Sequence, residues 1–295
     1  MKEIIKAILN KVGLLIYIKK ILKFDLKKSK EYPIIKYSYE KFIFSNRSSL
    51  IWTTHKGASS VVTKMLKNLE KKINFGYFDY ESKICKYSKE LDKIYDPNDL
   101  LEEYNDIFFQ RFNNIYGPLR KPYEIDYMNS YNHIFILRDP RDVLISSYYW
   151  FGYNAESRTP EHYGLHNMFV KRRDKIQSLS KDDACIYLAD EWLLDIYAKY
   201  LEIYKKYENT FFIPYKFLKS NPDFFLESFF KASGVNDKKG TLKKLAQEVL
   251  RKKPSKNDLK HRRSGKSNQY LTELQPQTIE NLNSLFNPIL NAWDF

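Results

Sequence analysis

Short apolar runs alternate with longer amphipathic stretches along most of the chain. Runs of strand length stand at 48–54, 106–112, 133–139 and 210–218. Apolar residues recur every three or four positions at 59–72, 140–151, 183–207 and 223–234. The runs are typical of buried strands, and the recurring spacing is typical of helices with one buried face. Strands alternating with helices predict an α/β fold, a three-layer arrangement whose central parallel sheet is flanked by helices.

Local signals set the ends of several predicted elements. Pro140 falls in the first turn of one helix and Gly234 stands just beyond another, and both positions favour these residues. Gly117 and the following proline predict a turn after the second strand. Residues 73–103 are predicted to be irregular with short helices, and residues 152–180 to form a long polar insertion.

Residues 1–30 predict a separate amphipathic, basic helix, because apolar residues recur there at helical spacing between lysines. Their longest charge-free apolar run, 12–18, is much shorter than the about 20 residues that cross a bilayer. No signal-peptide cleavage site follows it. The helix either lies on an anionic membrane or packs on the rest of the chain. Residues 31–295 contain no repeat and no flexible linker, so they are expected to form one domain.

The composition is that of a globular chain with basic segments. Of 295 residues, 43% are hydrophobic and 16% are aromatic, which is ample for a core. Cys85 and Cys185 are too few for a disulfide framework, so a cytoplasmic protein is expected. The net charge of +14 is concentrated in residues 1–30 and 238–266. Such blocks favour polyanions: nucleic acid, anionic lipid or a highly phosphorylated ligand.

The stretch "IWTTHKGASSVVTKML", residues 51–66, resembles a shortened phosphate-binding loop. A strand meets Lys56 and Gly57, and a helix then begins on Ser59 and Ser60. The full P-loop needs an earlier glycine, which is missing here. Even so, the backbone N–H groups at the start of a helix form an anion site, to which the lysine adds charge.

A second candidate anion site lies in "HIFILRDPRDVLISSYYW". Arg138 stands at the end of a predicted strand, and Ser146 follows eight residues later on the next helix. Ligands of open α/β sheets bind outside the carboxyl ends of the strands, so these two residues could converge on one anion. Alternatively, Arg138 or Arg141 forms local ion pairs with Asp139 and Asp142.

A third stretch, "HRRSGKSNQYLTELQPQT", contains a basic turn. Gly265 could bend the backbone over an anion while Arg263 supplies a forked donor. In this order, the three stretches resemble the PAPS-dependent sulfotransferase family. "THKGASS" is similar to its 5′-phosphosulfate loop, "LRDPRDVLISSYYW" to its 3′-phosphate motif, and "RSGKSNQY" to its C-terminal loop. "IPYKFLKSNP" resembles the segment whose tyrosine touches adenine, here Tyr215.

The resemblance covers roughly residues 50–278 and implies a P-loop NTPase-like fold that moves a sulfuryl group from PAPS to a hydroxyl or amine. It implies that Lys56 neutralises charge on the leaving oxygen, in a reaction that needs positioning and charge stabilisation. The residues implied to hold the 5′-phosphate are Lys56, Gly57, Ala58, Ser59 and Ser60. Those implied to hold the 3′-phosphate are Arg138, Ser146, Arg263, Ser264 and Gly265. No metal ion is expected.

The general base is the largest departure from the family. Cytosolic members use a histidine where this chain has Tyr116, and a tyrosine with a pKa near 10 is a poor base at neutral pH. Some carbohydrate-acting relatives use a carboxylate, which makes Glu124 the preferred candidate. Other candidates are Asp126, His162 and His166. His55, beside Lys56, is expected to be packed rather than catalytic.

The preferred hypothesis for the acceptor is a saccharide or glycolipid, because the missing histidine argues against a small phenol and the N-terminal helix suits a membrane-derived substrate. Two other functions stay open. A basic nucleic-acid-binding protein would use residues 238–266, although none of the standard nucleic-acid motifs is present. A membrane-surface adaptor would carry an inactive nucleotide site, as the altered residues Gly57, Ala58 and Tyr116 allow. A nucleotide kinase is disfavoured by the shortened loop.

Overall fold

The computed structural model describes residues 47–70, 72, 75–84, 99, 101–102, 105–154, 166–237, 240–251 and 266–295. The expected N-terminal helix, residues 1–30, lies outside the described residues, as do Arg263, Ser264 and Gly265 of the C-terminal loop. None of the helices in the described ranges is both long and apolar enough to cross a lipid bilayer.

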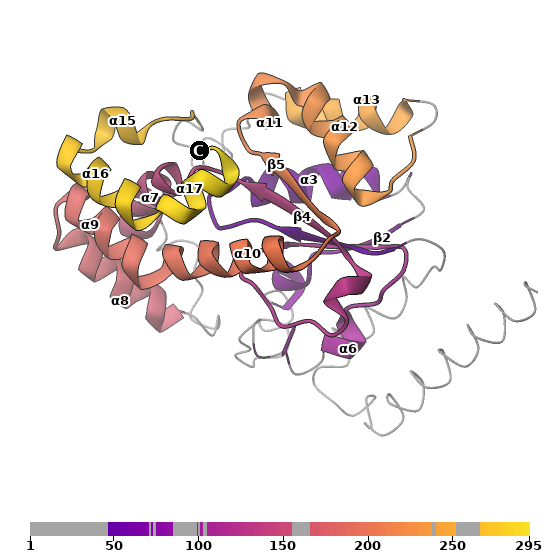
Figure 1. Cartoon of the computed structure of the whole chain (residues 1–295), viewed down its shortest axis with the longest axis horizontal. Helices are drawn as coiled ribbons and strands as arrows, with labels where there is room; N and C mark the ends of the chain where they lie inside the picture. Colours follow the sequence, from indigo (N-terminus) through magenta and orange to yellow (C-terminus); the bar gives the residue numbers. More distant parts are fainter. Residues whose placement is uncertain are drawn as a thin grey trace, which may run out of the picture.

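Five parallel strands form the central sheet, in the order β2-β3-β1-β4-β5. They are β1 (Ser49–Trp52), β2 (Gly76–Phe78), β3 (Asn114–Leu119), β4 (Asn132–Leu137) and β5 (Thr210–Pro214). Helices cover both faces of this sheet (Figure 1). The predicted parallel α/β architecture is therefore confirmed. Strands β1 and β5 lie within predicted strands, and β4 begins one residue before the strand predicted at 133–139.

The predicted strand at 106–112 is wrong, and so is the turn predicted at Gly117. Residues Asn105–Phe108 are helical, and the strand is β3, which contains both Gly117 and Pro118. Leu50 of β1 pairs with Tyr116 but Trp52 pairs with Leu119, so β3 carries one extra residue in a β-bulge. A bulge leaves one residue out of the hydrogen-bond ladder, so a proline is tolerated inside the sheet. Gly117 has φ +125°, and a Cβ there would lie 2.7 Å from the Ile51 carbonyl oxygen.

Two further elements lie where the sequence predicts irregular structure. Strand β2 falls inside 73–103, and its three residues are too few to show a period, although all are buried. Part of the predicted polar insertion, 152–180, is a helix of 12 residues.

The described helices are α3 (Ser59–Leu69), α6 (Asn105–Phe108), α7 (Pro140–Tyr149), α8 (His166–Gln177), α9 (Lys181–Leu188), α10 (Leu194–Lys206), α11 (Phe217–Ser220), α12 (Pro222–Ser233), α13 (Thr241–Arg251), α15 (Tyr270–Glu273), α16 (Pro276–Leu285) and α17 (Asn287–Trp293). A π-helical turn at 189–193 joins α9 to α10, so the long helix predicted at 183–207 is one continuous segment. Pro140 opens α7 and Gly234, with φ 69°, ends α12, as predicted.

Alternate residues of the strands build two cores, one on each face of the sheet. Leu50 and Trp52 of β1 pack in a core with α7, α9, α10 and α17. Ile51 packs in the other core with α3, α12 and α13. Figure 1 shows α10 below the sheet and α12 with α13 above it.

One polar pair is buried between β1 and β4. The Trp52 indole N–H donates to Nδ1 of His133 at 3.2 Å, and Nε2 of His133 lies 2.9 Å from the Met128 carbonyl oxygen. Nδ1 therefore accepts, and the ring proton sits on Nε2. Burial lowers the pKa of His133 to about 4. A second proton would have to bind Nδ1, where it would point at the Trp52 N–H and replace a hydrogen bond by a repulsive contact.

Candidate active site

Polar side chains follow all five strands at their carboxyl ends. Lys56 follows β1, Glu81 follows β2, Arg120 follows β3, Arg138 follows β4 and Tyr215 follows β5. Because the strands are parallel, these ends meet at one edge of the sheet, where α/β proteins bind their ligands.

The loop from β1 to α3 makes a tight turn around Gly57. The Gly57 N–H donates to the Thr54 carbonyl at 3.0 Å, and the Thr53 hydroxyl donates to the Gly57 carbonyl at 2.7 Å. A Cβ on Gly57 would lie 2.7 Å from Oγ1 of Thr54. Lys56 and Ala58, on either side, have φ of 66° and 91°, the left-handed region that disfavours side chains.

Helix α3 begins at this loop without a side-chain cap. Ala58 occupies the N-cap position and offers no side-chain acceptor, and the first turn contains no acidic residue. The N–H groups of a first helical turn lack partners inside the helix and carry a partial positive charge. The predicted residues Ser59 and Ser60 form this turn, so the loop and helix start can hold an anion.

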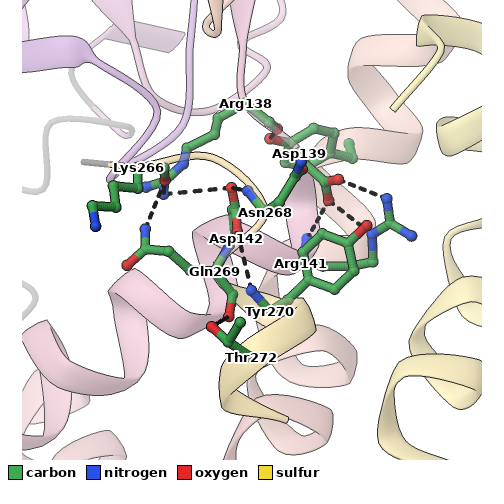
Figure 2. Close-up of polar contacts among 10 residues, drawn as sticks. Arg138, Asp139, Arg141, Asp142, Lys266, Asn268, Gln269, Tyr270 and Thr272 are labelled. Atoms are coloured by element: carbon green, nitrogen blue, oxygen red, sulfur yellow. Dashed lines mark hydrogen bonds and ion pairs between the residues drawn. The ribbon is translucent and has the colours of Figure 1, made fainter. Parts of the chain in front are cut away.

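Arg138 lies in a second polar centre (Figure 2). Its Nη2 donates to the Lys266 carbonyl at 2.7 Å and lies 3.6 Å from an Asp142 carboxylate oxygen. Its guanidinium sits 5.2 Å from the ring centroid of Tyr215. The side chain is 4% exposed, and its Nε has no hydrogen-bond partner among the described residues. A buried donor without an acceptor fits an anionic ligand.

The local ion pairs of Arg138 and Arg141 with Asp142 and Asp139 also form, but they differ in length and in the number of contacts. Asp139 binds Arg141 through two oxygens, at 3.0 Å to Nε and 2.6 Å to Nη2. Arg141 is thereby engaged within the protein. The pair of Arg138 with Asp142 is longer, at 3.6 Å, and leaves part of the guanidinium available.

Asp142 fastens the C-terminal loop beside Arg138. Its carboxylate accepts from the backbone N–H groups of Asn268 at 2.9 Å, Gln269 at 2.7 Å and Tyr270 at 3.3 Å (Figure 2). Ser146 is four residues after Asp142 on α7, hence on the same face of the helix. The structure thus gathers Arg138, Tyr215 and the loop that continues from the predicted residues 263–265.

A cavity of about 360 Å³ opens near the loop that carries Lys56. Its buried walls include Tyr123, Phe151, Phe169, Arg172 and Trp192, and the half-buried His55 also lines it. Its other charged lining residues are Glu102, Lys121, Glu191, Asp195 and Lys199. The Lys56 ammonium lies 5.3 Å from the ring centroid of Trp150, on which the His55 ring also stacks, so the cavity adjoins the anion loop.

His55 is packed, as predicted, but it also lines this cavity. Its ring stacks on Trp150 with centroids 6.1 Å apart and lies 6.5 Å from that of Trp192. Burial lowers the pKa of His55 well below its usual range, and the cations Arg120 and Lys56 lower it further. The imidazole is therefore neutral at neutral pH and able to accept a proton.

Glu81, Arg120 and Tyr123 form a buried network that the sequence analysis missed. Arg120 donates to Glu81 through Nη1 at 2.5 Å and through its backbone N–H at 2.8 Å, and the Tyr123 hydroxyl donates at 2.8 Å. Burial raises the pKa of Tyr123, and Glu81 raises it further. The signal for these residues is their place just after β2 and β3, two strands that the sequence pattern does not reveal.

The predicted bases are less well placed than His55. Glu124 is exposed and does not line the cavity, although Pro122 and Tyr123 do. Tyr116 is fully buried in β3, where Asn114 donates to its hydroxyl at 2.9 Å. Asp126 is exposed, His162 lies outside the described residues, and His166 begins α8.

Comparison with known proteins adds three findings. The sequence model of the family described as "Sulfotransferase domain" matches residues 46–294. Two solved structures are similar: the mouse sulfotransferase SULT7A1 complexed with PAP has 12% identity and a TM-score of 0.48, over 88% of this chain and 89% of that one. Retinol dehydratase in complex with androsterone and inactive cofactor PAP has 13% identity and a TM-score of 0.43, over 89% and 87%. Curated protein sequences give no match.

Proposed function

The chain belongs to the PAPS-dependent sulfotransferase family, whose sequence model spans residues 46–294, and we propose that it transfers a sulfuryl group to a hydroxyl or amine of an acceptor held in the His55 cavity. The observation that carries this proposal is the buried Arg138, whose Nε lacks a partner among the described residues. It follows β4, the neighbour of β1, so it stands at the same sheet edge as the uncapped start of α3.

Two anion sites at one edge fit a nucleotide that carries phosphate at both its 5′ and 3′ positions. The N–H groups of residues 58–60 would hold the 5′-phosphate, since the Gly57 N–H already donates to the Thr54 carbonyl. Arg138, Ser146 and residues 263–265 would hold the 3′-phosphate, and Tyr215 would lie against the adenine. PAPS, when bound, supplies the activated sulfuryl group.

Transfer requires charge stabilisation and a base. As the acceptor oxygen bonds to sulfur, the bond from sulfur to the 5′-phosphate oxygen breaks and its electron pair stays on that oxygen. Lys56 stands at the loop where this charge develops. The acceptor proton must pass to a base. His55 is favoured by its place in the cavity and its neutral ring, whereas Glu124 is the candidate from sequence.

The cavity is compatible with a ring-shaped acceptor. Phe151, Phe169 and Trp192 give it aromatic walls, against which the apolar face of a sugar or another ring can pack. We therefore retain a saccharide or glycolipid head group as the proposed acceptor.

The experiment that tests this function compares 3′,5′-bisphosphoadenosine (PAP) with AMP. A ligand at 100 times its Kd stabilises a protein by about 2.7 kcal/mol. We expect PAP to raise the melting temperature by several degrees and AMP, at equal concentration, by much less, since a charged hydrogen bond contributes about 1.5–3 kcal/mol. The readouts are thermal unfolding and transfer of label from PAPS.

Arg138→Gln should abolish the advantage of PAP over AMP. Lys67→Gln, an exposed cation at the far end of α3, is the matched control and should keep it. Equal shifts with PAP and AMP in the unaltered protein would disprove the 3′-phosphate assignment. Absence of both binding and transfer would disprove the proposed function.

A further inference from the structure

Arg172 is a buried cation in the wall of the acceptor cavity. It stands on α8, is 6% exposed, and lines the cavity together with His55. Its guanidinium lies 5.2 Å from the ring centroid of Phe151 and 5.7 Å from that of Trp192. Its Nε has no hydrogen-bond partner among the described residues.

This cation lacks a carboxylate partner in the part of the chain that the structure describes. Burial lowers the pKa of Arg172, although the charge and the hydrogen-bonding hydroxyl of Tyr187, and the charge of Glu191, act to raise it. Glu191 does not come within ion-pair distance, because no salt bridge of Arg172 occurs among the described residues. Burying a charge is costly unless it is paired and hydrogen-bonded. The two aromatic faces offset part of this cost, but they leave the Nε donor unused.

The other charged side chains of the cavity are less buried than Arg172: Lys121 is half-buried and Lys199 is exposed. Glu102, Glu191 and Asp195 are exposed, and Asp195 is already paired with Lys199 at 3.1 Å. Exposed charges are screened by water and salt, so they affect a bound molecule weakly. Among the cations that line the cavity, Arg172 is the most buried.

Arg172 also lies near the reaction centre. It is close enough to His55 to contribute to the lowered pKa of that imidazole. The cavity volume of about 360 Å³ is near the lower end of the range for small-molecule sites, about 300–1,000 Å³. This volume is enough for an acceptor with a single ring.

Resting on the proposed sulfuryl transfer, we propose that the acceptor is an anionic hydroxy compound, whose carboxylate binds Arg172 while its hydroxyl faces His55 and Lys56. A uronic acid or a hydroxylated aromatic acid has this chemistry. The Nε side of a guanidinium presents two parallel N–H groups, which match the two oxygens of a carboxylate. The sulfuryl group replaces the hydroxyl proton, which passes to the base, and the carboxylate is unchanged.

The test uses matched acceptor pairs. Nitrophenyl glucuronide is compared with nitrophenyl glucoside, and para-hydroxybenzoate with its methyl ester. para-Hydroxyphenyl phosphate is added to distinguish a carboxylate from a phosphate requirement. Rates of sulfuryl transfer from PAPS are measured with the full chain. Each probe is also added to PAP-saturated protein, and its effect on the melting temperature is recorded.

We expect the acid of a pair to exceed its neutral partner in kcat/KM by about 10- to 100-fold, the range of one charged hydrogen bond. Arg172→Gln should bring the ratio of kcat/KM for the acid to that for its neutral partner close to one, whatever the change in the neutral acceptor's own rate, to which the pKa of His55 contributes. Lys171→Gln, the adjacent exposed cation on α8, should keep the preference. If Arg172→Gln does not fold, Arg172→Lys replaces it, and it should lose most of the preference because a lysine lacks the forked geometry.

The failures are distinguishable. If PAP does not stabilise the unaltered protein, the proposed function itself is wrong. If PAP binds but acids and neutral partners behave alike in both assays, the anionic acceptor is wrong. A preference for acids that survives Arg172→Gln also overturns it. A preference for the phosphate alone would overturn the carboxylate assignment.

Discussion

Gly57 and Ala58 meet two different backbone requirements in the anion loop. Gly57 has no room for a Cβ, because Oγ1 of Thr54 would be 2.7 Å away and Oγ1 of Thr53 2.9 Å away. Ala58 carries a side chain in a left-handed conformation, with φ 91°. Gly57 is therefore required because a side chain would not fit, whereas Ala58 occupies the position with the strained φ angle.

Gly57→Ala and Ala58→Gly should therefore have opposite effects on the free energy of unfolding. Gly57→Ala should lower the free energy of unfolding by about 1–3 kcal/mol, the usual cost of overpacking. Ala58→Gly should raise it by up to about 1 kcal/mol. The substitution relieves the left-handed penalty of about 1–2 kcal/mol, but a glycine also gives the unfolded chain more conformational entropy, which offsets part of this gain. Urea unfolding of both variants measures this. A stable Gly57→Ala would show that the loop can rearrange.

His55 and Glu124 compete for the role of base, and paired variants separate them. His55→Gln should lower kcat by about 10²–10⁴ while PAP binding persists, and Glu124→Gln should stay near the unaltered rate. Because burial lowers the pKa of His55, its neutral form persists as the pH falls. Activity should thus stay level from pH 8 to 6.5 and decline only in more acidic solution. A large loss in Glu124→Gln alone would favour the carboxylate instead.

At the scale of elements, β1 and β4 are joined by a pair that tolerates only one protonation state. His133 accepts from Trp52 through Nδ1 and is fully buried. An unfolded histidine titrates near pH 6.5, whereas the pKa of His133 in the fold is about 4. Between these values the unfolded state binds more protons, so stability falls as the pH falls.

The expected loss for His133 is about 3 kcal/mol between pH 6.5 and 4, from about 1.4 kcal/mol for each pKa unit. His133→Asn keeps an acceptor for the Trp52 N–H but does not titrate. It should be less stable at neutral pH, yet lose about 3 kcal/mol less on acidification. Urea unfolding at several pH values tests this. Parallel pH curves for the two proteins would show that His133 does not control the acid response.

At the scale of the molecule, the sequence predicts the side chains that follow long apolar strands. Lys56, Arg138 and Tyr215 follow β1, β4 and β5, whose runs are clear. Glu81 and Arg120 were missed because β2 has three residues and β3 contains a Gly-Pro pair that normally marks a turn. Local periodicity cannot reveal a strand that is fixed by its neighbours in the sheet.

The base and acceptor contacts were harder still to predict. Arg172 lies on a helix whose sequence shows no amphipathic period, and His55 acquires its properties from burial among distant side chains. The contacts of Arg172 and His55 in the cavity depend on packing between segments far apart in sequence, which a local pattern does not record.

The bulge in β3 shifts by one residue the alternation of side chains between the two faces of the sheet. In a regular strand, residues two apart share a face. Tyr116 and Leu119 share a core although they are three apart, because the extra residue intervenes. Arg120 comes directly after Leu119, at the end of this shifted strand, and binds Glu81 from there. At this point the number of residues matters as much as their identity: a substitution at Pro118 keeps the phase, whereas a deletion there would turn the strand end over and separate the two charges.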